Sequence, residues 1–395
     1  MKLLVYSHYF APSIGGVETI VLGLSRGLAE LRMANGAPEF EITVVTDTPA
    51  GNYDDRALPF LVIRQPGLFY LWRLVRACDV IHAAGPALLP LFLARLAGKP
   101  AAVEHHGYQA ICPNGILVHQ PDRSVCPGHF QARRYAECLR CNARETSWLR
   151  SCRNLFLMFP RHALTRRVAA NVAITQHVLQ RLVLPRSSVT YYGIDDPLHD
   201  TFPSQIFSAS SGRTCFAYVG RFVQEKGIPI LLQAAKKLIG EGHQFEVRLI
   251  GDGDERPSLD EMIGREHLES CVHITGYLAG AALTDTLRDV RAVIMPSIWE
   301  ETAGLAVIEQ MMRGRLVIVS DIGGLGEIVG DAGLQFPPGN ADALADCMRD
   351  VLRNPSLIQS YGGKARERAL RLFMRGRMIE EHASVYREMF QERDG

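Results

Sequence analysis

An alternation of short apolar runs with helix-period stretches continues along almost the whole chain, and it constrains the fold more than any other feature. In the first half we expect buried strands at residues 2–7, 40–46, 79–83, 101–106, 171–175 and 189–192. Amphipathic stretches such as 17–31 and 87–96 lie between them and are typical of helices. Strands that alternate with helices predict a parallel sheet with helices on both faces.

The alternation stops near residues 195–212, where Pro, Ser and Gly gather as in a linker, and then starts again. The fold class is therefore α/β, with two Rossmann-like, doubly wound parallel-sheet domains. We expect one domain at 1–200 with a C-terminal helix at about 375–395, and a second at 210–374. The second should contain strands at 215–219, 245–250, 272–275, 292–295 and 316–320, and helices that begin at Gly227, Glu255, Ala281, Gly304 and Gly324.

Charge and hydropathy exclude several classes of protein. The 43 Lys and Arg against 42 Asp and Glu leave a net charge of +1, so no global basic field indicates a nucleic-acid partner. The first residues do not resemble a secretory signal, and the best apolar stretch, 86–103, is interrupted by Arg95 and Lys99. We therefore expect a soluble cytoplasmic protein whose nine cysteines are reduced.

Two loops that follow predicted strands are suited to anions. Gly15 and Gly16 lie between the first strand and its helix, where glycines let a ligand approach the backbone and a helix N-terminus offers free N–H groups. A tight turn without a ligand explains them equally well. The sequence from Gly220 to Gly227 places Arg221 and Lys226 before another helix, which is suited to a diphosphate. The alternative is that both cations are solvated surface charges.

A third loop, 296–309, is the most specific. Glu301 follows a predicted strand and so lies at the carboxyl edge of the sheet, where open α/β sheets bind ligands. Glu309 lies in the next helix among apolar residues. A carboxylate there needs hydrogen-bond donors, and sugar hydroxyls are suitable. An ion pair with Arg313, one turn on, is the alternative.

Together these motifs resemble glycosyltransferase family 4. The family has the GT-B fold, in which two Rossmann-like domains face a central cleft. The likeness covers nearly the whole chain, and the second domain carries the sharper motifs. It rests on Gly15-Gly16, on Gly220-Arg221 with Lys226-Gly227, on Glu301 and Glu309 seven residues apart, and on 249–253, 276–278 and 320–324.

The resemblance implies a retaining, metal-independent hexosyltransferase. It would move a sugar from a nucleotide-diphosphate sugar to a hydroxyl of a sugar or lipid-linked acceptor, in polysaccharide, lipopolysaccharide or glycolipid biosynthesis. The catalytic residues that it implies are His106, Arg221, Lys226 and Glu301. The donor-binding residues that it implies are Gly15, Gly16, Arg221, Lys226, Gly253, Tyr277, Glu301, Gly304, Leu305 and Glu309, with the cations on the diphosphate, Glu309 on the ribose and Glu301 on the sugar.

The chemistry of transfer agrees with these roles. The leaving diphosphate gains negative charge as its bond to the sugar breaks, and two fixed cations would stabilise that charge. No motif supplies a carboxylate nucleophile, so we expect the leaving phosphate to take the acceptor proton on the same face of the sugar. His105 competes with His106, and both could be ordinary histidines at a strand end. A GT-B epimerase or phosphorylase, and a non-catalytic metal-stabilised binding protein, are the rival functions.

Residues 107–168 are too long for a loop between a strand and a helix. They contain Cys112, Cys126, Cys138 and Cys141, and the last two have the spacing of zinc ligands. A structural Zn²⁺ site, an iron–sulfur site and four free thiols all remain open. The Arg-rich stretch that follows, with Arg150, Arg153, Phe156 and Phe159, is suited to an anionic membrane surface or to a lipid-linked acceptor, or is a solvated helix face. Membrane contact would place the protein on the cytoplasmic face of the inner membrane.

Overall fold

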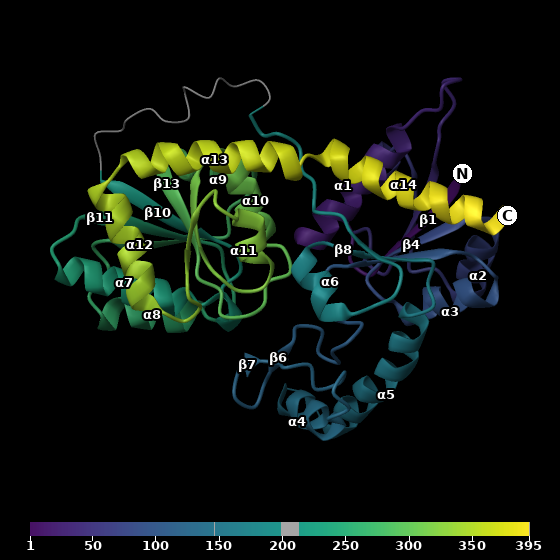
Figure 1. Cartoon of the computed structure of the whole chain (residues 1–395), viewed down its shortest axis with the longest axis horizontal. Helices are drawn as coiled ribbons and strands as arrows, with labels where there is room; N and C mark the ends of the chain where they lie inside the picture. Colours follow the sequence, from purple (N-terminus) through teal and green to yellow (C-terminus); the bar gives the residue numbers. More distant parts are fainter. Residues whose placement is uncertain (146, 199–212, 395) are drawn as a thin grey trace. The chain divides into compact units, whose positions relative to one another are not determined.

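The computed structural model describes residues 1–145, 147–198 and 213–394, with the side chains of 142–145 and 393–394 left aside. The chain divides into two compact units (Figure 1). Unit 1 contains Met1–Asp195 and Phe373–Gly395, and unit 2 contains Asp196–Leu372. The predicted linker at 195–212 and the predicted domain limits at 200 and 210 lie largely outside the described residues.

Unit 1 is built on seven parallel strands in the order β3-β2-β1-β4-β5-β8-β9. Its core includes Leu4, Val45, Ile81 and Val103, one from each of four neighbouring strands. The strands are β1 (Lys2–Ser7), β2 (Glu41–Thr46), β3 (Leu61–Arg64), β4 (Val80–Ala84), β5 (Ala101–His105), β8 (Ala170–Ala173) and β9 (Ser187–Val189). The helices that accompany this sheet are α1 (Gly16–Glu30), α2 (Leu68–Ala77), α3 (Leu88–Leu96), α6 (Gln176–Leu182) and α14 (Arg375–Asp394), with a short 3-10 helix η1 (Asp55–Ala57).

Helix α14 reaches unit 1 from the far end of the sequence. It packs against α1 and β4, and Met378, Ala383 and Tyr386 on it are completely buried. At its start, Ile194 N donates to Phe373 O at 2.9 Å and Arg375 N donates to Ile194 O at 2.9 Å. The last helix of the chain is therefore part of the core of unit 1.

The long segment after β5 forms a subdomain of unit 1. It contains a small antiparallel hairpin of β6 (Val118–His119) and β7 (Ser124–Val125), followed by α4 (Tyr135–Glu145) and α5 (Trp148–Thr165). Phe130, Cys138, Leu155 and Met158 make its own hydrophobic cluster. The prediction that this segment is more than a loop is confirmed.

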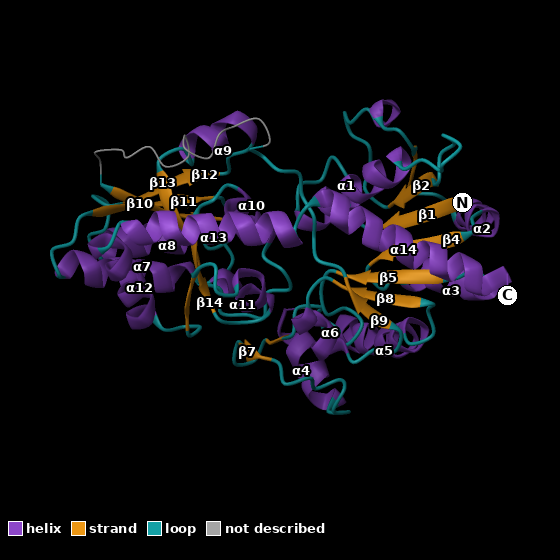
Figure 2. Cartoon of the chain, turned by 45° about the horizontal axis from the view of Figure 1, so that its top comes forward, coloured by secondary structure: helices purple, strands orange, loops and turns teal. Residues whose placement is uncertain are grey.

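Unit 2 has six parallel strands in the order β12-β11-β10-β13-β14-β15, and helices accompany this sheet as well (Figure 2). The strands are β10 (Thr214–Val219), β11 (Phe245–Ile250), β12 (Val272–Gly276), β13 (Val290–Met295), β14 (Leu316–Ser320) and β15 (Leu334–Phe336). The helices are η3 (Gln224–Lys226), α7 (Ile228–Gly240), α8 (Arg256–Arg265), α9 (Gly280–Thr286), α10 (Leu305–Met312), α11 (Gly324–Val329), α12 (Ala341–Arg353) and α13 (Ser356–Leu372). The predicted fold class, α/β with two Rossmann-like sheets, is confirmed.

Three details of the expected strand pattern are wrong. Strands β3 and β15 were not expected, because short edge strands with few buried side chains give only a weak apolar signal. The strand expected at 189–192 is β9, which ends at Val189. Beyond it Thr190 N still donates to Ala173 O of β8 at 2.9 Å, and the apolar character further on reflects the burial of the Tyr192 side chain. Strand β5 ends at His105, so His106 is the first residue after it.

In the described residues, no helix is both long enough and apolar enough to cross a membrane.

Candidate active site

The order of the strands in unit 2 reverses between β10 and β13, which start connections that run in opposite directions. Open α/β sheets bind their ligands at such a switch point, beyond the carboxyl ends of the strands. Lys226 follows β10, and Glu301 follows β13. The two residues of greatest interest in the second half of the sequence are therefore brought to the same edge of one sheet.

Lys226 and Glu301 form a buried ion pair between Nζ and Oε1. The side chains are 17% and 6% exposed, and Ser297 Oγ donates a hydrogen bond of 2.8 Å to the same carboxylate oxygen. Burial raises the pKa of Glu301, but the charge of Lys226 and the hydrogen bonds from Lys226, Ser297 and Trp299 outweigh it, so the pKa lies below its usual value. The site thus holds a lysine and a carboxylate that are each other's partner.

A glycine makes this pairing possible. Gly227 has φ +65°, and a Cβ on it would lie 2.1 Å from the carbonyl oxygen of Pro296. A side chain would therefore push the loop after β10 away from the loop after β13. The two loops are also joined by a hydrogen bond of 3.0 Å from Ile298 N to Glu225 O. Close contact between the backbones sets the position of Lys226 beside Glu301.

Helix α10 starts at the same edge. Gly304, at φ +68°, is its N-cap and Leu305 its first residue, and no side chain caps the helix. Val307 N donates to Gly304 O at 2.8 Å, which leaves the N–H groups of Leu305 and Ala306 suited to an anion or a hydroxyl. Glu309 lies one turn further and is half-buried. Burial raises its pKa, and the nearby Arg313 offsets that only in part. In the described structure Glu309 and Arg313 form no ion pair, so the alternative explanation of Glu309 as a partner of Arg313 is wrong.

The other residues of unit 2 that were predicted to bind the nucleotide-sugar donor follow β10, β11 and β12. Arg221 is exposed, and its carbonyl accepts a hydrogen bond of 2.8 Å from Tyr218 Oη. Gly253 has φ +155°, and a Cβ on it would lie 2.4 Å from Phe222 O. Tyr277 is 57% exposed. All of these positions lie at the carboxyl end of the sheet.

Unit 1 has a switch point of its own, between β1 and β4. Gly15 and Gly16 lie beyond β1, where Gly15 is the N-cap of α1 and Gly16 its first residue. Gly15 has φ −176°, which any residue adopts, so its backbone conformation does not require glycine there. A Cβ at Gly15 would instead meet the Glu18 carboxylate at 2.3 Å.

His106 is nearly buried, with a side chain only 5% exposed. Its Nδ1 is 2.7 Å from Tyr192 Oη, and its Nε2 is 3.4 Å from Glu104 Oε2. Burial is the main cause of its lowered pKa, against the opposing charge of Glu104. His106 is therefore neutral near pH 7, the form that accepts a proton.

The competing histidine, His105, is completely buried, and its Nε2 is 2.9 Å from Asn171 Oδ1. Burial lowers its pKa to about 4. The side chain of His105 thus belongs to the interior of unit 1.

The four cysteines of the subdomain are gathered in its interior, each 5–6% exposed. Burial and the nearness of the other three thiols raise the pKa of Cys138 to about 12. Cys141 Sγ accepts a hydrogen bond of 3.3 Å from Gln120 N. In the described part of the chain, no three of these sulfurs lie within 4.8 Å of one another, so the metal at these cysteines stays a prediction.

Three partners of these residues were not foreseen. Ser297 lies within the loop motif but has no charge to single it out, and Glu104 stands next to the two histidines in sequence. Tyr192 comes from a segment that was expected to be a strand. Only the adjacency of Glu104 to His105 and His106 was a signal that could have been used.

Comparison with known proteins identifies the part of the chain that contains the Lys226–Glu301 pair. Residues 203–368 match the family described as "Glycosyl transferases group 1". This match covers less than half of the chain, and we call the matched residues the group 1 domain after it.

Curated proteins that are similar to this chain include two bacterial transferases. Alpha-D-kanosaminyltransferase of Streptomyces kanamyceticus is 28% identical over 179 residues, which is 45% of this chain and 46% of the relative. Phosphatidyl-myo-inositol mannosyltransferase of Mycolicibacterium smegmatis is 29% identical over 180 residues, which is 45% of this chain and 44% of the relative. The matches thus span less than half the length of these relatives.

Solved structures extend the likeness to the whole fold. Anabaena HepE in complex with UDP has a TM-score of 0.74 and 18% identity, and the match covers 98% of this chain and all of that one. The lipopolysaccharide outer core galactosyltransferase WaaB has a TM-score of 0.67 and 12% identity over 98% of this chain. These likenesses show that the group 1 domain and unit 1 together have the GT-B fold.

Proposed function

We propose that this protein is a retaining glycosyltransferase that moves a sugar from a nucleotide-diphosphate sugar to an acceptor hydroxyl. The observation that carries the proposal is the buried Lys226–Glu301 pair at the switch point of the group 1 domain. A paired cation and anion beside a helix N-terminus are suited to a substrate that presents both phosphates and sugar hydroxyls. HepE was solved with UDP and with UDP-glucose, which supports a donor of this class.

The proposed donor contacts follow from the chemistry of each side chain. Lys226 and the exposed Arg221 bind the diphosphate, and Glu301 accepts hydrogen bonds from the sugar hydroxyls. The N–H groups of Gly304 and Leu305 at the start of α10 contact the sugar or the distal phosphate. Glu309 accepts from the ribose hydroxyls, because a half-buried carboxylate with a raised pKa gains most from new donors. Gly253 and Tyr277 belong to the same donor site.

The ion pair gives Lys226 two roles in succession. Before the donor binds, the charge of Lys226 is balanced by Glu301. When the diphosphate binds, Lys226 keeps its position and also contacts a phosphate oxygen, which gains charge as the glycosidic bond breaks. Fixed donors of this kind stabilise a transition state strongly, because no solvent has to reorganise around them.

From unit 1, the family resemblance adds Gly15 and Gly16 as diphosphate contacts and His106 as a catalytic residue. Retention is proposed to follow a same-face path in which the leaving phosphate takes the proton of the acceptor hydroxyl. That path needs no catalytic metal. The acceptor is proposed to be a sugar or a lipid-linked sugar of polysaccharide, lipopolysaccharide or glycolipid biosynthesis, and WaaB is a structural neighbour with such a description.

Two measurements on the full chain test this function. First, UDP, GDP, ADP and their sugars are screened by thermal shift, and we expect one nucleotide series to raise the Tm. Second, nucleotide release from the selected donor is followed with and without a panel of sugar and lipid-linked acceptors, and the anomeric configuration of the product is read by NMR. A transferase releases nucleotide in proportion to acceptor, whereas an epimerase converts the donor without an acceptor.

The matched control is a second Lys–Glu pair of unit 2. Lys236 forms an ion pair with Glu266 on the surface, where Lys236 is 60% exposed. Lys226→Ala should abolish the nucleotide-induced shift in Tm, and Lys236→Ala should preserve it. Equal shifts in both variants, or a product of inverted configuration, would contradict the proposed site or the proposed stereochemistry respectively.

A further inference from the structure

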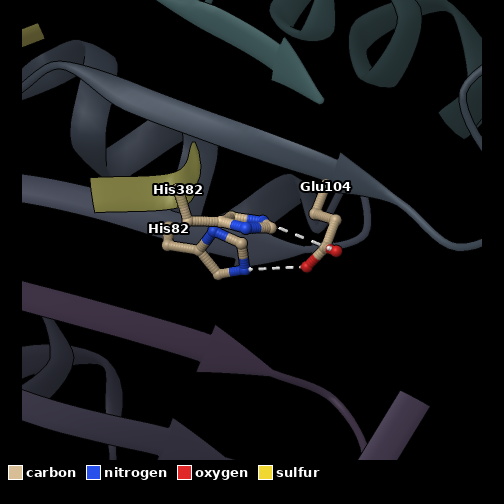
Figure 3. Close-up of side chains that lie close together, drawn as sticks. All are labelled: His82, Glu104 and His382. Atoms are coloured by element: carbon tan, nitrogen blue, oxygen red, sulfur yellow. Dashed lines mark ion pairs between the residues drawn. The ribbon is translucent and has the colours of Figure 1, made fainter. Parts of the chain in front are cut away.

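Three buried side chains of unit 1, which we call the His–Glu cluster, face one another: His82 on β4, Glu104 on β5 and His382 on α14 (Figure 3). Each is completely buried. One nitrogen of each imidazole and one oxygen of the carboxylate lie within 4.8 Å of one another. The proposed transfer reaction uses none of these three residues.

The atoms that face one another have no hydrogen-bond partner. This holds for Nε2 of His82, Nε2 of His382 and both carboxylate oxygens of Glu104. Buried polar atoms are almost always hydrogen-bonded, and a group of unpaired ones at a single place needs an explanation, such as a bound ion. The unpaired atoms here are two imidazole nitrogens and a carboxylate, which are ordinary ligands of a transition metal.

The separations are longer than direct hydrogen bonds and fit a metal ion to which both carboxylate oxygens turn, since His82 faces Oε2 and His382 faces Oε1. His82 Nε2 is 3.4 Å from Glu104 Oε2, and His382 Nε2 is 3.6 Å from Glu104 Oε1. A direct N–H···O bond would be about 2.7–3.2 Å long. Ligand atoms at about 2.0–2.2 Å from a tetrahedral Zn²⁺ ion are about 3.3–3.6 Å apart, a consequence of the bond lengths alone.

The opposite nitrogen of each histidine is already held in place. His82 Nδ1 is 2.8 Å from Tyr386 Oη, and His382 Nδ1 is 2.9 Å from the carbonyl oxygen of Met378. Metal-binding histidines are usually oriented by such a partner on the second ring nitrogen. The bond to a carbonyl requires a proton on Nδ1 of His382, so in the neutral ring Nε2 presents its lone pair to Glu104. Facing lone pairs of this kind need either a cation between them or a proton on Nε2.

We propose that the His–Glu cluster binds a divalent transition-metal ion of the Zn²⁺ type through His82 Nε2, His382 Nε2 and the Glu104 carboxylate. The ion would join β4 and β5 to α14, and so fasten the last helix of the chain to the sheet of unit 1. The role is structural and separate from the cysteines of the subdomain, and the ion would lie near His106, whose Nε2 is 3.4 Å from Glu104 Oε2.

The test uses full-length protein that was prepared without a polyhistidine tag and carries Cys138→Ser and Cys141→Ser, so that thiolates do not contribute. Metal content is measured after exposure to Zn²⁺ and gel filtration, and we expect about one equivalent per chain. A His82→Gln, His382→Gln double variant should lose it. His162→Gln is the matched control, because His162 Nδ1 also lies 3.1 Å from a carbonyl, that of Ala110, and should keep it.

A second readout needs no substitution in the cluster and so survives a failure of the double variant to fold. Protein stripped with a chelator should melt several degrees lower and recover its Tm when Zn²⁺ is restored, because a ligand of the native state alone stabilises it. Co²⁺ in place of Zn²⁺ should give d–d absorption without a thiolate charge-transfer band. No bound metal and no response of the Tm would overturn the proposal in favour of a protonated His382 paired with Glu104. Neither result depends on whether the protein transfers a sugar.

Discussion

At the scale of single residues, the contacts that the charged side chains make with one another determine how the site is arranged. The sequence identified Lys226 and Glu301 separately, as a phosphate cation and a sugar-binding carboxylate. The structure adds that each is the other's partner and that Ser297 holds the same carboxylate oxygen. The pair keeps Lys226 oriented in a mostly buried position, which reduces the cost of ordering it when a donor binds.

Replacing Lys226 should slow the chemical step itself. The leaving diphosphate gains charge in the transition state, so Lys226→Ala should lower kcat by about a hundredfold or more, as loss of one oxyanion donor does. Steady-state kinetics with the identified donor measure this, with Lys236→Ala as the control. A change in KM alone would show that Lys226 does not act on the leaving group.

Replacing Glu309 should change the donor KM more than kcat, in contrast to replacing Lys226. The ribose is remote from the reacting carbon and is held similarly in the ground and transition states, so Glu309→Ala should raise the donor KM more than it lowers kcat. The same kinetic series measures both constants. An equal loss in kcat and in kcat/KM would place Glu309 near the reacting atoms instead.

The Lys226–Glu301 ion pair should weaken as the pH falls. The pKa of Glu301 in the folded protein is lower than its usual value near 4.5. The pair therefore contributes its full stability above about pH 4.5 and loses it as the pH falls through the folded pKa. Glu301→Gln should cost on the order of 1–3 kcal/mol at pH 7, and the difference in Tm from wild type should shrink towards acid pH. A difference that stays constant over that range would exclude this titration.

At the scale of secondary structure, the sequence predicted elements well where burial is regular. The expected strands and helices of unit 2 from residue 214 to 329 begin within two residues of the observed ones, because buried parallel strands and amphipathic helices have clear periods. The edge strands β3 and β15 were missed because their side chains are only partly buried. The interior of the subdomain could not be predicted, since strands of two residues are too short to show an alternation of apolar and polar residues.

The placement of the site could be predicted in part for the same reason. Residues that directly follow a central strand, such as Lys226 and Glu301, were expected at the carboxyl edge, where they lie. The cluster of His82, Glu104 and His382 could not be predicted, because its members come from two strands and from a helix almost three hundred residues later. No local pattern connects such residues before the chain folds.

The subdomain should depend on its cysteines. A metal that binds Cys112, Cys126, Cys138 and Cys141 would have to deprotonate thiols whose pKa values burial raises, and would contribute its binding energy to folding. Elemental analysis of protein purified without a polyhistidine tag should show metal that Cys138→Ser with Cys141→Ser removes. Cys152→Ser is the control, because Cys152 is exposed on α5. Equal metal content in all three proteins would exclude the cysteines as ligands.

Helix α5 should mediate contact with an anionic membrane. Its surface shows Leu149 at 81% and Phe156 at 72% exposure, with Arg150 and Arg153 exposed between them. Each arginine near such a surface contributes about 1 kcal/mol, screened by salt. Co-sedimentation with phosphatidylglycerol vesicles should therefore fall as salt rises, and should weaken in the Arg150→Gln, Arg153→Gln variant.

The control for this experiment is Arg265→Gln with Arg288→Gln, which removes two exposed arginines of unit 2. Binding that is indifferent to salt and to lipid charge would reject α5 as an electrostatic contact.

At the scale of the whole molecule, unit 1 is discontinuous in sequence. Its sheet comes from the first 195 residues, whereas α14 comes after all of unit 2. The face of β4 that carries His82 is covered by α14, and Tyr386 reaches His82 from that helix. The bulk of unit 2 is thus inserted between two parts of one hydrophobic core.

This order has a consequence during translation. A ribosome adds about 5–20 residues per second, so roughly 10–35 s pass between the completion of β9 and the appearance of α14. In that interval the nascent sheet lacks the helix that packs against β4, so the side chains of His82 and Glu104, which are buried in the finished unit, are exposed to water and to chaperones. Unit 2, whose segments are nearly consecutive, can fold in the meantime. Unit 1, whose synthesis begins first, is therefore completed only after all of unit 2 has been synthesised.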